Sequence, residues 1–138
     1  MLSVVIPALN ASAALGATLA SITAADEVVV VDGGSTDGTA ALAAAQNARV
    51  VAGARGRGQQ LADGVAAATG DWLLLLHADT RLAPGWRAVM AAHMAIAPDR
   101  AGYCRFALDS DDPRARRLER LVACAAGCWP CHMATRAC

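Results

Sequence analysis

Short apolar runs alternate with helical segments along most of the chain, and this alternation restricts the fold more than any other feature of the sequence. The apolar runs are continuous and rich in valine, isoleucine or leucine, as in strands that are buried on both faces. They cover residues 2–6, 27–32, 49–52 and 72–76. The segments between them have helical spacing or composition and cover residues 12–26, 39–46 and 58–68. Strands that alternate with helices predict parallel β-α-β units, and therefore an α/β fold with a mostly parallel sheet flanked by helices.

Weaker patterns extend this interpretation into the rest of the chain. Pro84 is expected in the first turn of a helix that runs through Met94. Residues 101–108 predict a further strand, and residues 114–126 predict a helix with an arginine-rich outer face. Near the start of the chain, Ser12 is expected to cap the first helix.

The composition excludes several classes of protein. A chain of 138 residues that is 56% hydrophobic and 17% charged can bury a core as one domain, so it is not disordered as a whole. Its twelve basic residues balance its twelve acidic residues, and no basic cluster indicates a nucleic-acid partner. No apolar run approaches the roughly 20 residues of a membrane-spanning helix, and no secretory signal is visible. We therefore expect a cytoplasmic protein without a transmembrane segment.

Polar loops follow the predicted strands at their carboxyl ends, the edge where open α/β sheets bind ligands. The loop after the second strand begins with Asp32, whose carboxylate can accept a hydrogen bond from a base imide or a ribose hydroxyl. Gly33 and Gly34 let the backbone pass close to a ligand, and Thr36 or Asp37 can cap the next helix. Taken alone, a loop of this composition is more often a tight turn with a helix cap.

A second acidic loop follows the fourth strand. Asp79 can supply oxygen ligands to Mg²⁺ or Mn²⁺, and such an ion neutralises the charge that develops on a diphosphate leaving group. Taken alone, Asp79 is equally well explained as a helix cap or a partner of Arg81, and His77 as a solvated loop histidine. Because both acidic loops are expected at one edge of the sheet, together they favour a ligand site.

The glycines of residues 53–58 precede a helix, as in dinucleotide-binding proteins. Their order is not G-x-G-x-x-G, and they follow the third strand and not the first, so the pattern argues against a Rossmann dehydrogenase. Arg55 and Arg57 in this loop can reach the phosphates or base of a nucleotide, or they can be solvated surface arginines.

Three motifs occur in order and at matching spacing. They are Leu-Ser-Val-Val-Ile-Pro-Ala-Leu-Asn at residues 2–10, Val-Val-Asp-Gly-Gly-Ser-Thr-Asp-Gly-Thr at residues 30–39, and Gly-Asp-Trp-Leu-Leu-Leu-Leu-His-Ala-Asp-Thr-Arg at residues 70–81. From residue 2 to about residue 108 the chain resembles family-2 glycosyltransferases of the GT-A fold, a Rossmann-like, mostly parallel sheet flanked by helices. It is most similar to a bacterial subfamily with His-Ala-Asp-Thr-Arg at the metal site, sometimes linked to arsenosugar biosynthesis.

The resemblance implies that the chain binds a nucleotide-diphospho-sugar donor. It places Asp79 at the metal-binding position, the last acid of the family's Asp-X-Asp motif, whereas His77 replaces the first acid. Because imidazole is a softer ligand than carboxylate, this replacement favours Mn²⁺ over Mg²⁺. The donor-binding residues implied by the resemblance are Pro7, Asn10, Asp32, Gly34, Arg57 and His77.

Members of this subfamily are longer than 138 residues, and their second half supplies the acceptor pocket and the carboxylate base that deprotonates the acceptor. We therefore assign no catalytic base in this chain and expect donor binding with little or no transfer. Loss of such a base alone costs on the order of 10²- to 10⁴-fold in rate. A sheet truncated in this way has exposed edges, which a homodimer would cover.

Residues 124–138 interrupt the pattern and contain four of the five cysteines, so we separate them from the donor-binding part, residues 1–123. Cys124, Cys128 and Cys131 have the spacing of a radical S-adenosylmethionine iron–sulfur motif, and His132 or Cys138 could complete a zinc site. We favour a third hypothesis, a shifted reading frame. Codons for residues 127–138 can be chosen so that a shifted frame encodes Pro-Tyr-Gly-Asp-Gln, which looks like the subfamily's next motif.

Two other classes of function stay open at this point. A nucleotidyltransferase of related architecture would carry a glycine-rich loop with arginine or lysine directly after the first strand. This chain has Pro-Ala-Leu-Asn there, at residues 7–10, which is not such a loop. A non-catalytic protein that binds metal through the cysteine cluster would contain bound metal after purification.

Overall fold

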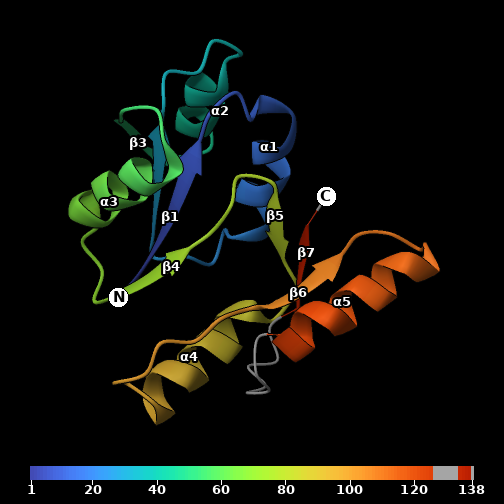
Figure 1. Ribbon diagram of the computed structural model, residues 1–138. Helices are drawn as coiled ribbons and strands as arrows, with labels where there is room; N and C mark the ends of the chain where they lie inside the picture. Colours follow the sequence, from blue (N-terminus) through green and yellow to red (C-terminus); the bar gives the residue numbers. More distant parts are fainter. Residues whose placement is uncertain (126–133, 138) are drawn as a thin grey trace. The chain divides into compact units, whose positions relative to one another are not determined.

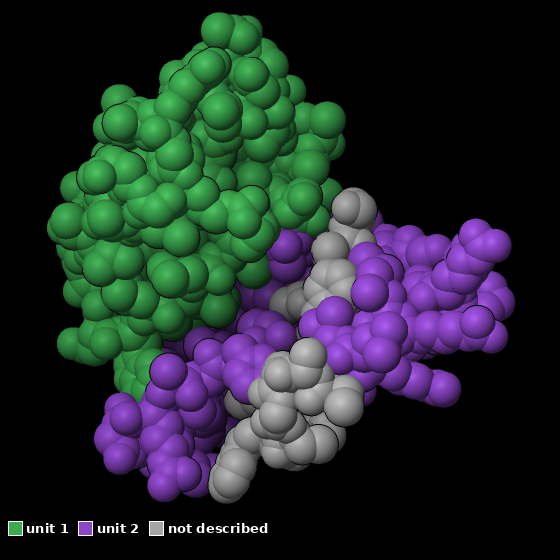
Figure 2. Space-filling model, viewed as in Figure 1, with its two compact units in different colours: residues 1–79 green, residues 80–138 purple. Residues whose placement is uncertain are grey.

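A computed structural model describes residues 1–125 and 134–137 of the chain (Figure 1). The chain divides into two compact units, Met1–Asp79 and Thr80–Cys138, which Figure 2 shows in different colours. Cys124 falls in a helix of the second unit. Cys128, Cys131, His132 and Cys138 lie outside the described residues, so the hypotheses about the tail stay predictions.

The first unit contains a parallel sheet in the order β3-β2-β1-β4. Its strands are β1 (Leu2–Ala8), β2 (Glu27–Asp32), β3 (Arg49–Ala52) and β4 (Trp72–Leu75). Ala8 lies opposite Asp32, and Asp32 lies opposite Ala52, so β1, β2 and β3 end together at one edge. The prediction of a parallel sheet built from β-α-β units is therefore confirmed.

Helices cover both faces of this sheet (Figure 1). They are α1 (Ser12–Ser21), α2 (Thr39–Ala45) and α3 (Arg57–Ala67). Crossovers between parallel strands are right-handed, so the path from β1 through β2 to β3 puts α1 and α2 on one face. The return from β3 to β4, on the other side of β1, puts α3 on the opposite face.

The packing of α3 against the sheet depends on a glycine. The core beneath this helix contains Val5, Val29 and Val31, with Val51 and Leu61 packed against it. A Cβ atom added at Gly64 would lie 2.3 Å from Val5 Cγ1 and 2.9 Å from Val31 Cγ2. The helix backbone at Gly64 therefore lies directly on the valine side chains. Any larger residue at this position would force the helix or the valines to move.

A cluster of hydrogen bonds ties the strands together at the amino end of the sheet. The Glu27 carboxylate accepts hydrogen bonds from the Ser3 hydroxyl and, at 2.8 Å, from the Thr69 backbone N–H. The Ser3 hydroxyl in turn accepts from the Gly70 N–H at 2.9 Å. These bonds, led by that from Ser3, hold the pKa of Glu27 below its ordinary value. This end of the sheet is thus fixed by side chains, whereas the opposite edge carries the long polar loops.

The second unit is a smaller α/β arrangement. It contains β5 (Thr80–Leu82), α4 (Trp86–Ile96), β6 (Arg105–Leu108), α5 (Pro113–Ala125) and β7 (Ala134–Ala137). Its sheet has the order β5-β7-β6, in which β7 is antiparallel to β5 and parallel to β6. Arg81 and Asp109 form an ion pair at 2.7 Å, and Glu119 of α5 accepts the Leu108 N–H at 2.7 Å.

Several boundaries differ from the sequence-based expectations. Ser12 is the first residue of α1, and Ala11 occupies the cap position without a side-chain hydrogen bond. Pro84 precedes α4, which begins at Trp86 after Gly85 turns the chain in a left-handed conformation. The strands β5 and β7 were not predicted, since their sequences, Thr-Arg-Leu and Ala-Thr-Arg-Ala, are not continuous apolar runs. Within the described residues, no helix has the length and apolarity to cross a membrane.

Replacement of Gly64 by alanine tests the close packing of α3. Because the new Cβ would overlap Val5 and Val31, we expect a loss of roughly 1–3 kcal/mol in the free energy of unfolding. Urea unfolding measures it.

The matched control is Gly58→Ala in the same helix, where an added Cβ meets no atom within 4 Å. That change is expected to stabilise the protein by about 0.5–1 kcal/mol, since alanine loses less conformational freedom in a helix. Equal effects of the two substitutions would contradict this account of the packing.

Candidate functional site

A cleft opens where the strand order of the first unit reverses. β1 leads into α1 on one face of the sheet, and α3, which precedes β4 in the chain, lies on the other face, so the first turns of α1 and α3 flank the carboxyl end of β1 from opposite sides. Open α/β sheets bind ligands at such a switch point. The cleft here has a volume of about 510 Å³, and its walls come from the end of β1, the first turns of α1 and α3, and the loop after β4.

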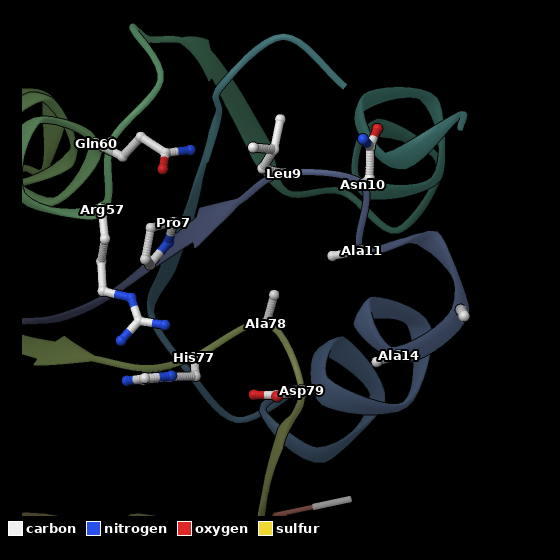
Figure 3. A pocket seen from close by; sticks show the side chains of 12 residues that line it. Pro7, Leu9, Asn10, Ala11, Ala14, Arg57, Gln60, His77, Ala78 and Asp79 are labelled. Atoms are coloured by element: carbon white, nitrogen blue, oxygen red, sulfur yellow. The ribbon is translucent and has the colours of Figure 1, made fainter. Parts of the chain in front are cut away.

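Five of the sequence-predicted site residues line this cleft, and Figure 3 shows their side chains. The Arg57 guanidinium points toward the His77 ring in this view. Arg55, from the same loop as Arg57, does not line the cleft. The five residues are Pro7, Asn10, Arg57, His77 and Asp79.

Asp32 and Gly34 are not among the residues that line the cleft. Asp32 is the last residue of β2 and Gly34 lies in the loop after it. The strand β2 lies on the far side of β1 from β4, so the ends of β2 and β4 are separated by about 10 Å. Asp32 Oδ2 accepts the backbone N–H groups of Gly34 at 3.2 Å and Ser35 at 3.0 Å. Asp32 Oδ1 is buried and has no hydrogen-bond partner among the described residues. Donor contact by Asp32 and Gly34 stays a prediction.

Asn10 joins the end of β1 to the loop after β2. Its backbone N–H donates to the Ser35 hydroxyl at 2.9 Å, and its side-chain oxygen accepts the Thr36 N–H at 2.9 Å. Asn10 has a φ of 50°, a left-handed conformation that asparagine adopts more readily than most residues. Hydrogen bonds therefore join the loop after β2 to Asn10, which itself lines the cleft.

Asp37 caps α1 across a gap of 25 residues in the sequence. Its carboxylate accepts the Ser12 N–H at 2.9 Å and, on the other oxygen, the Thr39 N–H at 3.0 Å. Thr39 Oγ1 accepts the Ala11 N–H at 2.9 Å. These hydrogen bonds hold the pKa of Asp37 well below its ordinary value, and the bond from the Thr39 hydroxyl has the largest effect. The sequence predicted Thr36 or Asp37 as the cap of the next helix. Gly38 occupies the cap position of α2 without a side-chain hydrogen bond, although Asp37 accepts the N–H of Thr39, the first residue of that helix. The contact of Asp37 with α1 was not foreseen.

Two further side chains at this edge were missed by the sequence analysis. Gln60 of α3 lines the cleft although only 4% of the residue is exposed, and it donates to the carbonyl oxygens of Ala8 and Val31. Thr18 of α1 is fully buried and donates to the carbonyl oxygen of Ala78 at 2.8 Å. A glutamine or threonine within a helical pattern gives no sequence signal of such a contact.

The cleft combines groups suited to an anion and to a divalent cation. Arg57 is the first residue of α3, whose first turn contains no acidic side chain, so the guanidinium and the helix dipole both favour negative charge there. Among the residues that line the cleft, Asp79 and His77 have side chains of a type that can ligate a metal. No group of three such side chains occurs in the described part of the chain. This donor set fits an ion that takes its remaining ligands from a bound phosphate and water.

A comparison with protein families decides which class of protein has this site. The model of the family described as "Glycosyl transferase family 2" matches residues 3–131. The chain belongs to glycosyl transferase family 2. The chain is also similar to uncharacterized glycosyltransferases of Mycobacterium tuberculosis and Mycobacterium bovis. They are 42% identical over 84 residues, which make up 60% of this chain and 38% of each relative.

Solved structures of glycosyltransferases share the fold. Glucosyl-3-phosphoglycerate synthase from M. tuberculosis, in complex with Mn²⁺ and UDP-glucose, is 28% identical with a TM-score of 0.62. The similarity covers 91% of this chain and 49% of that chain. S. aureus TarS 1-349 is 22% identical with a TM-score of 0.64 over 78% of this chain and 34% of that one. The α/β fold of this family-2 member is therefore the expected GT-A fold. The chain spans about half the length of the synthase and a smaller share of TarS 1-349 and of the curated relatives.

Acidification tests the cap that Asp37 provides to α1. Because its pKa is lowered in the folded protein, the charged carboxylate stabilises the fold above the ordinary value of 3.8, and this contribution is lost as the pH falls through the lower folded value. We expect Asp37→Asn to unfold at a lower temperature than the wild type near neutral pH.

The gap between the two melting temperatures is expected to persist at pH 5 and to narrow only as the pH falls below 3.8. Thermal unfolding followed by circular dichroism across this range measures the gap. A gap that does not change with pH would show that the charge of Asp37 contributes nothing.

Proposed function

We propose that this chain binds the nucleotide-diphospho-sugar donor of a glycosyltransferase. In the whole enzyme, the sugar is transferred to an acceptor by metal-assisted displacement with inversion at the sugar carbon. The observation that carries the proposal is the meeting of Arg57 and Asp79 in one cleft at the switch point between β1 and β4. Membership of family 2 supports the class of reaction.

The parts of the cleft match the parts of such a donor. Arg57 and the start of α3 provide positive potential for the diphosphate. Pro7 and Asn10 lie toward β2, and we assign the base and ribose to this side together with Asp32 and Gly34. The unpaired Oδ1 of Asp32 supports this assignment, because a buried carboxylate oxygen gains from an N–H or O–H donor on the ligand.

We assign the metal to Asp79, with His77 beside it in the same cleft. A bound divalent ion would neutralise the charge that forms on the diphosphate as it leaves. Mn²⁺ accompanies UDP-glucose in the synthase structure, and an imidazole in the ligand set favours Mn²⁺ over Mg²⁺. We assign His77 to donor binding whether the bound ion is Mn²⁺ or Mg²⁺.

The acceptor and the general base belong, in our proposal, to sequence that the relatives have and this chain does not match. The similarity covers only 49% of the synthase and 38% of the curated relatives. On its own the chain is then a donor-binding part with little or no transfer. We place residues 124–138 outside that part and keep the shifted reading frame as their explanation, which the nucleotide sequence of the gene will test.

Several finer assignments belong to the same proposal. We place the chain in the subfamily with His-Ala-Asp-Thr-Arg at residues 77–81, which is sometimes linked to arsenosugar biosynthesis. We also propose a cytoplasmic location, no nucleic-acid partner, and a homodimer that covers exposed sheet edges.

Thermal unfolding with a panel of nucleotide-sugars tests donor binding. At a free concentration of 100 times Kd, a bound ligand adds about 2.7 kcal/mol to the free energy of unfolding. We expect UDP and UDP-sugars to raise the melting temperature, Mn²⁺ to enlarge the shift more than Mg²⁺ does, and Asp79→Ala to remove only the part of the shift that depends on metal.

The matched control is Asp71→Ala, which removes an exposed carboxylate at the other end of β4, where it binds the N-terminal amine at 2.8 Å. This variant should keep the full effect of Mn²⁺. No stabilisation by any nucleotide or nucleotide-sugar would overturn the proposed function.

Arg57→Ala and Arg55→Ala form a second test, since these neighbouring arginines differ in their position. Only Arg57 lines the cleft. Loss of a hydrogen bond to a charged group costs roughly 1.5–3 kcal/mol, so we expect Arg57→Ala to weaken UDP binding roughly ten- to a hundredfold.

Isothermal titration calorimetry measures the two dissociation constants. Arg55→Ala is expected to bind as the wild type does, within about twofold. An equal loss in both variants would mean that the arginines act only through their general charge.

A further inference from the structure

Two buried polar side chains donate hydrogen bonds to the backbone of the segments that form the cleft. We infer that Gln60 and Thr18 are positioning residues that set the cleft in its binding geometry before any ligand arrives. Gln60 orders the loops on the nucleotide side, and Thr18 orders the loop that carries His77 and Asp79. This inference rests on the proposed function and assigns these two residues a part in it.

Gln60 joins the ends of β1 and β2. Its side-chain amide nitrogen donates to the carbonyl oxygen of Ala8 at 2.7 Å and to that of Val31 at 3.0 Å. An amide nitrogen has two hydrogens, so both donors of this buried group are used. The residue is 4% exposed, and loss of its bonds would leave two carbonyl groups in a buried place without these donors.

The contacts of Gln60 reach the loop after β2 as well. The Ala8 carbonyl also accepts the Gly33 N–H at 2.9 Å, so one oxygen joins the β1 end, the Asp32 loop and α3. A Cβ atom at Gly33 would lie 2.8 Å from Gln60 Nε2, which shows how closely the side chain fits against this loop. Gln60 therefore fixes the distance between the loops that begin at Leu9 and at Gly33.

Thr18 performs the corresponding task on the metal side. It is the fully buried residue of α1 whose hydroxyl donates to the Ala78 carbonyl at 2.8 Å. Ala78 lies between His77 and Asp79, and all three line the cleft. The loop after β4 is thus tied to α1, 60 residues away in the sequence. A fixed backbone at Ala78 limits where the Asp79 carboxylate can lie.

The two contacts act on different loops, so they predict different losses. Gln60 binds carbonyls of β1 and β2, whereas Thr18 binds a carbonyl beyond β4. Loss of the Gln60 hydrogen bonds should weaken nucleotide binding both with and without metal. Loss of the Thr18 hydrogen bond should reduce the increase in nucleotide affinity that Mn²⁺ gives. Residues that orient metal ligands typically contribute about tenfold or more to metal affinity.

The experiment uses matched substitutions and two measured quantities. Gln60→Met keeps the length of the side chain without its donors, and Gln59→Met makes the same change at the neighbouring exposed glutamine, which does not line the cleft. Thr18→Val keeps the shape without the hydroxyl, and Thr18→Ser keeps the hydroxyl. Calorimetry gives the Kd of UDP without metal and the factor by which saturating Mn²⁺ lowers it.

We expect Gln60→Met to raise the metal-free Kd roughly five- to tenfold, equivalent to about 1–1.4 kcal/mol, and to leave the Mn²⁺ factor unchanged. Thr18→Val should reduce the Mn²⁺ factor roughly tenfold and, because His77 lies on the same loop, raise the metal-free Kd less than Gln60→Met does. Gln59→Met and Thr18→Ser should resemble the wild type. Parallel losses in both quantities for both variants, or no loss in either, would overturn the inference.

Amide hydrogen exchange on the ligand-free protein separates this inference from the proposed function. Gln60→Met should speed exchange in residues 33–36, and Thr18→Val in residues 77–79. If the wild type binds no nucleotide, the proposed function fails, and exchange that is unchanged in these segments would refute the positioning roles as well. If Gln60→Met does not fold, Gln60→Asn keeps the amide on a shorter side chain and should change the same quantities in the same direction.

Discussion

The reversal of strand order between β1 and β4 is the constraint on which the other features of the first unit depend. Since α1 and α3 lie on opposite faces of the sheet, nothing in the backbone path fills the space between the two strand ends. A cleft follows from the topology alone. What the sequence adds are the small residues at the start of α1, the arginine at the start of α3 and the acidic loop after β4. The close packing at Gly64 keeps α3 near enough to the sheet for Gln60 to reach two strand ends.

The polar loops at this edge are held mostly by each other. Asp37 and Thr39 bind backbone N–H groups at the start of α1, and Asn10 exchanges hydrogen bonds with Ser35 and Thr36. The first N–H groups of a helix have no acceptor within the helix, and here side chains from the neighbouring loop accept the N–H groups of Ala11 and Ser12. The loops at this edge are therefore held by side-chain hydrogen bonds, although they contain no helix or strand.

The sequence predicted the parallel sheet, the edge where the cleft lies and five residues that line the cleft, because apolar runs and the loops that follow them carry local signals. Gln60 and Thr18 were not predicted, since their partners lie 52 and 60 residues away and only the fold brings them together. The position of Asp32 outside the cleft has the same cause. Residues at the ends of different strands share an edge, but the strand order decides which of them are neighbours, and a single sequence does not contain that order.

The cap that Asp37 gives to α1 has a consequence for protein engineering within the family. Residues 10–12 and 35–39 exchange their hydrogen bonds with each other, so neither segment keeps its conformation when the other is replaced. A graft that takes either segment from a relative has to carry both segments as one cassette. A chimera with a crossover between them would leave the first turn of α1 without its acceptors, and its failure would report this loss and not the effect of the exchanged residues.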